Sequence, residues 1–226
     1  MNQTVQAILR DFNPGKNPYF RALEDRSFER GDFVETQVQF YNAVVHIHRP
    51  MRTLANRTPS DRNREKILAN IQDELGHGNA QDSHEQTFLC FLNRIANLSE
   101  TEVRKKPVWA ELRAFNQQID HACAHQDYRF SAALLGMIEH LFSDVSTRIG
   151  KHLIQEQWMS PENLIHYNTH AVLDVQHAQD FYDVALPDWA QEADLITRGL
   201  QQGAQLLDNL YRDLYRHRQQ RNPACL

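Results

Sequence analysis

Cysteine is scarce in this chain of 226 residues. The three cysteines, Cys90, Cys123 and Cys225, have none of the short spacings typical of a zinc site, and an odd number cannot all pair within one chain. A reducing compartment fits this composition, and we interpret Cys90 and Cys123 as small core residues. The chain also begins without the basic start and apolar run of a secretory signal. We therefore expect a cytoplasmic protein.

Long apolar runs and an excess of positive charge are missing as well. No segment has the length and apolar character that spanning a bilayer requires. The 24 Lys and Arg residues are spread along the chain and are outnumbered by 29 Asp and Glu, which gives a net charge of -5. A general basic surface for nucleic acid is therefore excluded. We expect no membrane and no nucleic acid among the partners.

Glycine and proline are few, with eight of each, while hydrophobic residues make up 41% of the chain. That content is enough for a substantial core, and we expect one domain over residues 1–226. No segment alternates convincingly with period two, no glycine-rich phosphate loop follows a strand, and no repeat period appears. The sequence therefore predicts an all-α fold.

Apolar residues at helical spacing predict the helices and their ends. We expect helices over 3–12, from Tyr19, from Asp32 to about His48, and over 59–75, 81–96, 109–125, 127–157, 160–185 and 188–217. Asp32 and Ser160 are the expected N-caps of their helices, with Pro161 at a first helical position. Pro50 should kink or end its helix. The charged segment 97–107 is interpreted as a solvated linker.

One predicted helix carries a candidate metal-binding face. His170, Asp174 and His177 fall within an arc of roughly 60° on an α-helix, so their side chains converge. An exposed polar face with two histidines is the alternative. Burying unpaired polar groups among apolar neighbours is costly, which argues against that alternative. The apolar neighbours are Val172, Leu173, Val175, Ala178 and Phe181.

Other predicted helices offer partners, since helical bundles place metal sites between facing helices. Glu139 stands in the most apolar stretch of the chain, where an acidic side chain is rarely buried unless it is paired or binds a metal. Glu74 and His84 flank a glycine break, and His84 begins an apolar helical face. His77, between two glycines, is an alternative ligand or only a turn residue.

Together the candidates are three carboxylates and three imidazoles. They are Glu74, His84, Glu139, His170, Asp174 and His177. Mixed nitrogen and oxygen ligation suits iron or manganese, and six ligands exceed what one open catalytic metal normally uses. The set therefore predicts two metal ions bridged by carboxylate.

At these residues the sequence resembles the haem-oxygenase-like diiron oxidases and oxygenases, a branch of the TenA/PqqC-like helical superfamily. The resemblance rests on Glu74 with His84 ten residues later, on Glu139 in a central helix, and on the cluster at 170–177. It departs at His77, where some members have the first glutamate ligand. The resemblance implies a haem-oxygenase-like bundle and two Fe2+ ions, with Mn possible. It also implies O2 as co-substrate, hydrogen abstraction or oxygen transfer, and a homodimer.

The resemblance further implies a small-molecule substrate with a carboxylate, such as a fatty acid or an amino-acid-like compound, and a possible external reductant. Helical i, i+4 geometry suggests residues for the substrate pocket. These are Glu35, Gln37, Tyr41, His46, His48, His140 and Tyr167. Ligating imidazoles also need hydrogen-bonding partners. The candidates are Asp73, Asp144, Asp180, Tyr167 and Tyr182.

Two other classes of protein remain open. A metal-free TenA/PqqC-like enzyme of cofactor metabolism would share the fold, but the thiaminase branch uses a catalytic cysteine on the central helix, and residues 130–142 contain none. A non-catalytic helical binding protein would leave the convergent titratable groups without a purpose, which is costly if they are buried. We expect an O2-activating diiron enzyme.

Overall fold

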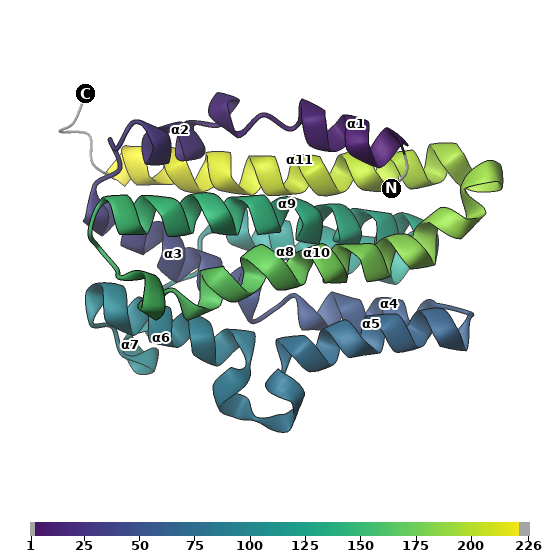
Figure 1. Ribbon diagram of the computed structural model, residues 1–226, viewed down its shortest axis with the longest axis horizontal. Coiled ribbons are helices and arrows are strands. Elements are labelled where there is room, and N and C mark those ends of the chain that lie inside the picture. Colours follow the sequence, from purple (N-terminus) through teal and green to yellow (C-terminus); the bar gives the residue numbers. More distant parts are fainter. Residues whose placement is uncertain (1–2, 222–226) are drawn as a thin grey trace.

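The computed structural model describes the backbone of residues 3–221 and the side chains of residues 3–217. Within this range the regular elements are all helical, which confirms the predicted all-α class (Figure 1). The α-helices are α1 (Gln3–Asp11), α2 (Pro18–Glu24), α3 (Arg30–Val44), α4 (His48–Arg57), α5 (Asp61–Glu74), α6 (His84–Ala96), α7 (Glu100–Lys105), α8 (Ala110–His125), α9 (Tyr128–Gln155), α10 (Ile165–Ala185) and α11 (Trp189–Arg221). Cys225 lies outside the described residues.

The bundle is organised around α9, which packs along α10 on one side and α11 on another (Figure 1). At Gly136 of α9, a Cβ atom would lie 2.9 Å from the ring of Tyr182 and 3.0 Å from the Cβ of Phe181. Only glycine therefore lets α10 approach this closely. The close approach sets Glu139, one turn along α9, against the middle of α10.

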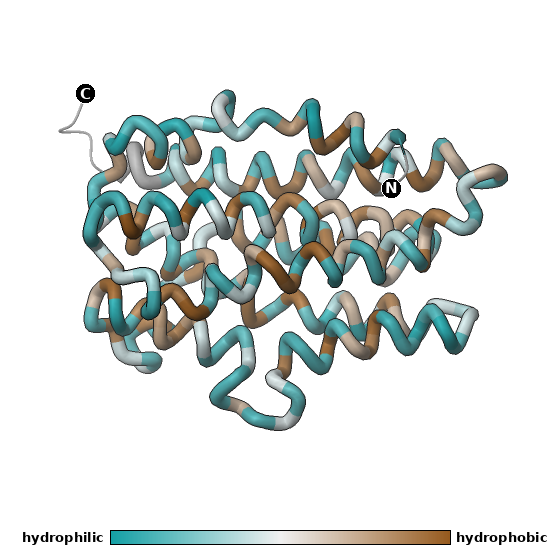
Figure 2. Tube along the Cα trace, in the orientation of Figure 1, coloured by the Kyte–Doolittle hydropathy of each residue, from teal (hydrophilic) through white to brown (hydrophobic). Residues whose placement is uncertain are grey.

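The remaining helices cover the other faces of this core. Helix α3 packs on α6 and α8, while α4 packs on α5 and α8, and both α5 and α6 contact α10. Brown, hydrophobic stretches gather between the helices in Figure 2, and the loop that joins α5 to α6 at the bottom of the view is largely hydrophilic. No helix in the described part of the chain has the length and apolar character of a membrane span.

The loop between α5 and α6 has an unusual backbone. Gly76, His77 and Gly78 follow one another with positive φ values of 71°, 51° and 87°. A Cβ atom on Gly76 would lie 2.5 Å from the backbone nitrogen of Ser83, so the chain can close this turn only with glycine. The tight turn brings the end of α5, at Glu74, beside the start of α6, at His84.

Most expected helices are present, but several ends differ. Helix α3 begins at Arg30 with Glu29 before it, so Asp32 lies in the first turn and is not the N-cap. Pro50 lies in the first turn of α4, where a missing N–H costs no helical hydrogen bond. Ser160 precedes only a short 3-10 turn, Pro161–Asn163, and α10 begins later at Ile165.

The expectation of a solvated linker over 97–107 was wrong. This segment contains α7, whose start is a capping box: Ser99 accepts from the backbone of Glu102, and the Glu102 side chain accepts from the backbone of Ser99. Val103 buries its side chain and anchors the helix. The Ser-x-x-Glu pattern that signals such a start was present in the sequence but was outweighed by the surrounding charges.

Candidate metal centre

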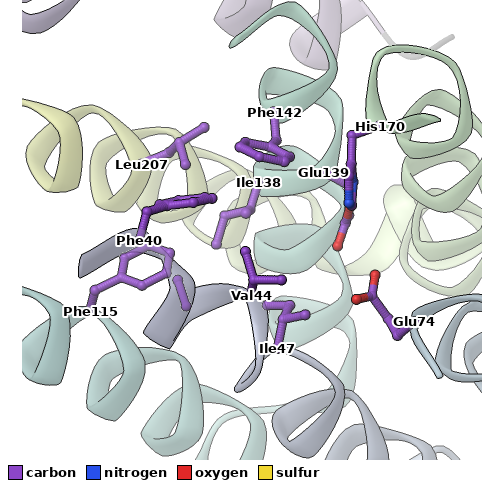
Figure 3. A pocket seen from close by; sticks show the side chains of 11 residues that line it. Phe40, Val44, Ile47, Glu74, Phe115, Ile138, Glu139, Phe142, His170 and Leu207 are labelled. Atoms are coloured by element: carbon purple, nitrogen blue, oxygen red, sulfur yellow. The ribbon is translucent and has the colours of Figure 1, made fainter. Parts of the chain in front are cut away.

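The six predicted ligand residues converge in the interior from α5, α6, α9 and α10. Each is at most 6% exposed. Glu74, Glu139 and His177 each offer one ligand atom within 4.8 Å of the others. In Figure 3 the carboxylate of Glu74 points toward Glu139 and His170. The structure therefore contains a buried Glu, Glu and His group that can hold a metal ion, with the other three candidates around it.

The loop between α5 and α6 places His84 against Glu74. The Nδ1 atom of His84 forms an ion pair with Oε2 of Glu74 at 2.8 Å, in a geometry that does not meet hydrogen-bond criteria. Burial opposes the ionisation of Glu74, but the charge of His84 outweighs it, and the pKa of the Glu74 carboxyl is lowered. An imidazole nitrogen and a carboxylate oxygen held this close are both atoms that can bind a metal ion.

On α10, His170 and His177 each bond through one nitrogen and leave the other free. Nδ1 of His170 is 2.8 Å from Oδ1 of Asp174, and its Nε2 has no partner. Nε2 of His177 is 3.1 Å from Oδ2 of Asp73. Because a carboxylate only accepts hydrogen bonds, the histidine is the donor. The free Nδ1 of His177 is 3.9 Å from Glu139. A carboxylate behind a metal-binding imidazole fixes its tautomer in this way.

These contacts test whether the residues suit a metal. Among the six candidate ligands, three buried nitrogens have no hydrogen-bond partner: Nδ1 of His84, Nε2 of His170 and Nδ1 of His177. Each buried, unpaired polar atom costs about 1–3 kcal/mol, so the arrangement is unfavourable unless something else binds there. Three imidazoles beside three carboxylates are the donors that iron or manganese prefers. The residues therefore fit the metal centre that the sequence predicted.

The protonation of the cluster points the same way. Burial, reinforced by the charge of Glu139, raises the pKa of Asp174 well above its usual range. Burial alone would lower the pKa of His177, but Glu139 and the other carboxylates outweigh it and raise this pKa to about 10. Both shifts favour the protonated forms, and a divalent ion that binds these groups would displace the protons.

A narrow apolar cavity adjoins the cluster (Figure 3). Glu74, Glu139 and His170 form its polar end. The rest of the wall is hydrophobic and comes from α3, α8, α9 and α11, with the loop after α3. These residues are Phe40, Ala43, Val44, Ile47, Phe115, Ile138, Phe142 and Leu207.

Among the described residues, this lining includes none of the predicted pocket residues Glu35, Gln37, Tyr41, His46, His48, His140 and Tyr167. The structure gives some of them other contacts. Gln37 is fully buried and accepts a hydrogen bond from the hydroxyl of Tyr167. Tyr41 donates to Glu85 at 2.7 Å. Helix α3 turns a different face to the cavity, with Phe40 and Val44, which the choice of polar residues passed over.

Only some of the expected hydrogen-bonding partners contact a candidate ligand. Asp73 contacts His177, as described above. Asp144 and Asp180 instead pair with Arg148 and Lys66. His77, the alternative ligand, has a side chain that is 69% exposed and lies 2.5 Å from Asp73. It therefore stands outside the buried cluster.

His166 is a residue of the site that the sequence analysis missed. It is 1% exposed, its ring centroid is 4.3 Å from that of His170, and its Nε2 has no partner. Its Nδ1 lies 3.1 Å from the hydroxyl of Thr87. Burial, with the charge of His170, lowers the pKa of His166 well below its usual range. The signal was its i, i+4 spacing from His170.

Solved structures with the same fold cover nearly the whole chain. A CADD-like protein of unknown function from Nostoc punctiforme has a TM-score of 0.77 at 13% identity over 95% of both chains. A domain of unknown function with a heme oxygenase-like fold from Shewanella denitrificans has a TM-score of 0.77 at 12% identity, over 96% of this chain and 91% of that chain. A TenA homolog from Pseudomonas syringae pv. tomato has a TM-score of 0.74 at 14% identity, over 95% and 92%.

At such low identity these likenesses show the fold, which is the haem-oxygenase-like bundle that the resemblance implied. A comparison with curated proteins found no significant match. The model of one family, described as iron-containing redox enzyme, matches residues 34–211 and so spans all six candidate ligands. This chain belongs to the family of iron-containing redox enzymes.

Proposed function

We propose that this protein is a non-haem diiron oxidase or oxygenase that uses O2 to act on a small carboxylate-containing metabolite. One observation carries the proposal. Buried carboxylates lie close to imidazole nitrogens that have no hydrogen-bond partner. One open catalytic ion rarely uses six protein ligands, so the set would hold two. Family membership supports iron as the metal.

Different residues would bind the metal, orient its ligands and exclude water. Glu74, His84, Glu139, His170, Asp174 and His177 would hold the metal. Iron(II) held by these residues would supply the electrons for O2 activation, and an external reductant would restore them after turnover. Asp73 keeps the His177 lone pair on Nδ1, facing Glu139. Phe142 and Ile138 keep the adjoining space apolar, so that water is disfavoured beside the cluster.

The cavity favours one kind of carboxylate substrate. Its lining contains no lysine or arginine among the described residues, so a carboxylate inside it could find positive charge only at the metal end. The remaining wall is hydrophobic and would desolvate an alkyl chain or an apolar ring at a gain of about 25 cal/mol per Å². A fatty acid therefore fits better than a zwitterionic amino acid. The homodimer stays a prediction from the resemblance.

Anaerobic loading with Fe(II) tests the proposal. Wild-type protein should bind about two iron ions and then consume O2 when air is admitted. Glu139→Ala should lower both iron content and O2 uptake severely, whereas Glu65→Ala, an exposed acid on α5, should lower neither. Wild-type protein that holds only trace iron, together with an unchanged rate in Glu139→Ala, would reject the proposal.

A metal-free enzyme is the second candidate, because a TenA homolog shares the fold. A cysteine nucleophile must form a thiolate and reach the substrate. Burial, with the charge of Asp120, raises the pKa of Cys123 to about 12. Neither Cys123 nor Cys90 lines the described cavity. Turnover that survives complete removal of metal by a chelator would favour this candidate.

A further inference from the structure

A chain of contacts runs from the surface to the buried cluster. His77, Asp73 and His177 have side-chain exposures of 69%, 25% and 1%. Nε2 of His77 is 2.5 Å from Oδ1 of Asp73, and Oδ2 of the same carboxylate is 3.1 Å from Nε2 of His177. Both oxygens of Asp73 are therefore engaged by histidines, one outside the cluster and one inside it.

We propose that His77 is a positioning residue of the metal centre, acting through Asp73 on the ring of His177. The inference rests on the proposed metal-binding function. A half-buried carboxylate held by one hydrogen bond can rotate, and water competes for its other oxygen. With His77 donating to Oδ1, the Oδ2 atom is aimed at His177. When a metal ion displaces the second proton of that ring, the proton on Nε2 stays with Asp73 and the lone pair is on Nδ1.

The backbone at His77 supports this role. Its φ of 51° lies in the left-handed region, which costs a non-glycine residue about 1–2 kcal/mol. Glycine occupies the positions on both sides, and glycine at 77 would avoid that cost. The contact with Asp73 is what the histidine side chain adds in return. Unfavourable backbone conformations of this kind gather at functional sites.

The geometry also separates this role from direct ligation. The side chain of His77 is largely exposed, whereas the candidate ligands are buried. Its Nε2 is already hydrogen-bonded to Asp73. His77 therefore belongs to the support of the cluster and not to its ligands.

Two substitutions test the inference through Co(II) binding to metal-free protein. His77→Gly removes the imidazole but suits the left-handed backbone, so the free energy of unfolding should be maintained or rise. Co(II) affinity should nevertheless fall by about 3- to 10-fold, near the lower end of the losses caused by removing partners of metal ligands. His77→Gln keeps an N–H donor at the same number of bonds from Cα and should recover most of that affinity. Gln81→Ala, in the same loop, is the control and should match wild type.

The absorption spectrum of bound Co(II) gives a second readout, because a misoriented His177 changes the ligand field whereas a purely structural loop residue would not. A shifted spectrum in His77→Gly that returns in His77→Gln supports the inference. Affinity and spectrum equal to wild type in His77→Gly overturn it, as does a loss in His77→Gly as complete as that in His177→Ala, which would make His77 a ligand. Wild-type protein that binds no Co(II) overturns the metal centre itself, a distinct failure.

Discussion

Two groups of buried polar residues lie side by side in this bundle, and they differ in how their hydrogen bonds are satisfied. In the first, which we call the tyrosine network, the hydroxyl of Tyr19 lies 3.1 Å from Thr36 and accepts from Gln37 at 2.7 Å, while Tyr167 donates to Gln37. All four side chains are buried and paired. The hydrogen bonds of this network are therefore satisfied by the protein's own side chains.

The second group is the metal cluster with His166. Its buried histidines leave nitrogens unpaired, although they are as deeply buried as the tyrosines. His166 and Tyr167 are sequence neighbours on α10, yet one ends in an unpaired atom and the other in a hydrogen bond. Buried polar atoms without partners are costly and need an explanation, and several of them in one place are what we expect of a ligand-binding site rather than of a structural network.

Metal loading should give the largest contrast between the groups. With metal at 100 times its dissociation constant, each independent site adds about 2.7 kcal/mol to the free energy of unfolding, so two sites add about 5 kcal/mol. Asp174→Asn should lose most of this gain, while Gln37→Ala should keep it. Denaturant unfolding with and without Mn(II) or anaerobic Fe(II) measures the effect. An equal gain in Asp174→Asn and wild type would contradict the assignment of the cluster.

The tyrosine network should show the reverse pattern. Gln37→Ala leaves the hydroxyl of Tyr167 without its partner, removes one of the two partners of Tyr19 and removes buried packing, so the free energy of unfolding should fall by about 2–3 kcal/mol. Metal affinity should stay within about twofold of wild type. Gln118→Ala, at an exposed position on α8, serves as the matched control. A network that tolerates Gln37→Ala without loss would not be structural.

The same contrast explains what the sequence could and could not predict. The helical class and most helices followed from apolar spacing. Glu139 was predicted as a ligand because an acid stood in an apolar stretch, and His170, Asp174 and His177 were predicted from their shared helical face. All of these signals lie within one helix.

Contacts between helices were beyond such reasoning. Gln37 and Tyr41 were expected at the pocket because they are polar. Their polar groups instead form hydrogen bonds with residues of α2, α10 and α6. Phe40 and Val44, which do line the cavity, look like ordinary core residues in sequence. The contact of His77 with Asp73 depends on a left-handed backbone that only the fold reveals. The assignment of the six ligands stays a prediction for metal loading to test.

A substitution in the apolar cavity should have a smaller effect, on ligand binding alone, and should leave both groups of buried polar residues intact. Val44→Phe adds bulk beside Ile47 and Ile138, between the cluster and the far end of the cavity. Binding of a long-chain fatty acid should weaken by about tenfold, which is ~1.4 kcal/mol, while iron content stays at the wild-type level. Calorimetric titration with acids of increasing chain length measures this. Equal weakening for short and long acids would contradict an alkyl-chain site.

The pH dependence of stability gives the smallest and most selective test, in metal-free protein. Burial first, then the charges of His170 and His84, hold the pKa of His166 well below its usual range. Below about pH 6.5 the unfolded chain therefore takes up a proton that folded His166 refuses, and stability falls as the pH falls. The slope from this one group reaches at most ~1.4 kcal/mol per pH unit.

The effect of His177 on the pH dependence of stability has the opposite sign, because its pKa is raised to about 10. Its contribution to the free energy of unfolding is fully present below pH 6.5 and is lost as the pH rises toward 10. His166→Phe should therefore flatten the acid side of the stability profile and leave the alkaline side unchanged. Urea unfolding at intervals from pH 5 to 9 measures both sides. Parallel acid slopes in His166→Phe and wild type would show that His166 is not held neutral by burial, and would remove it from the group of unpaired histidines.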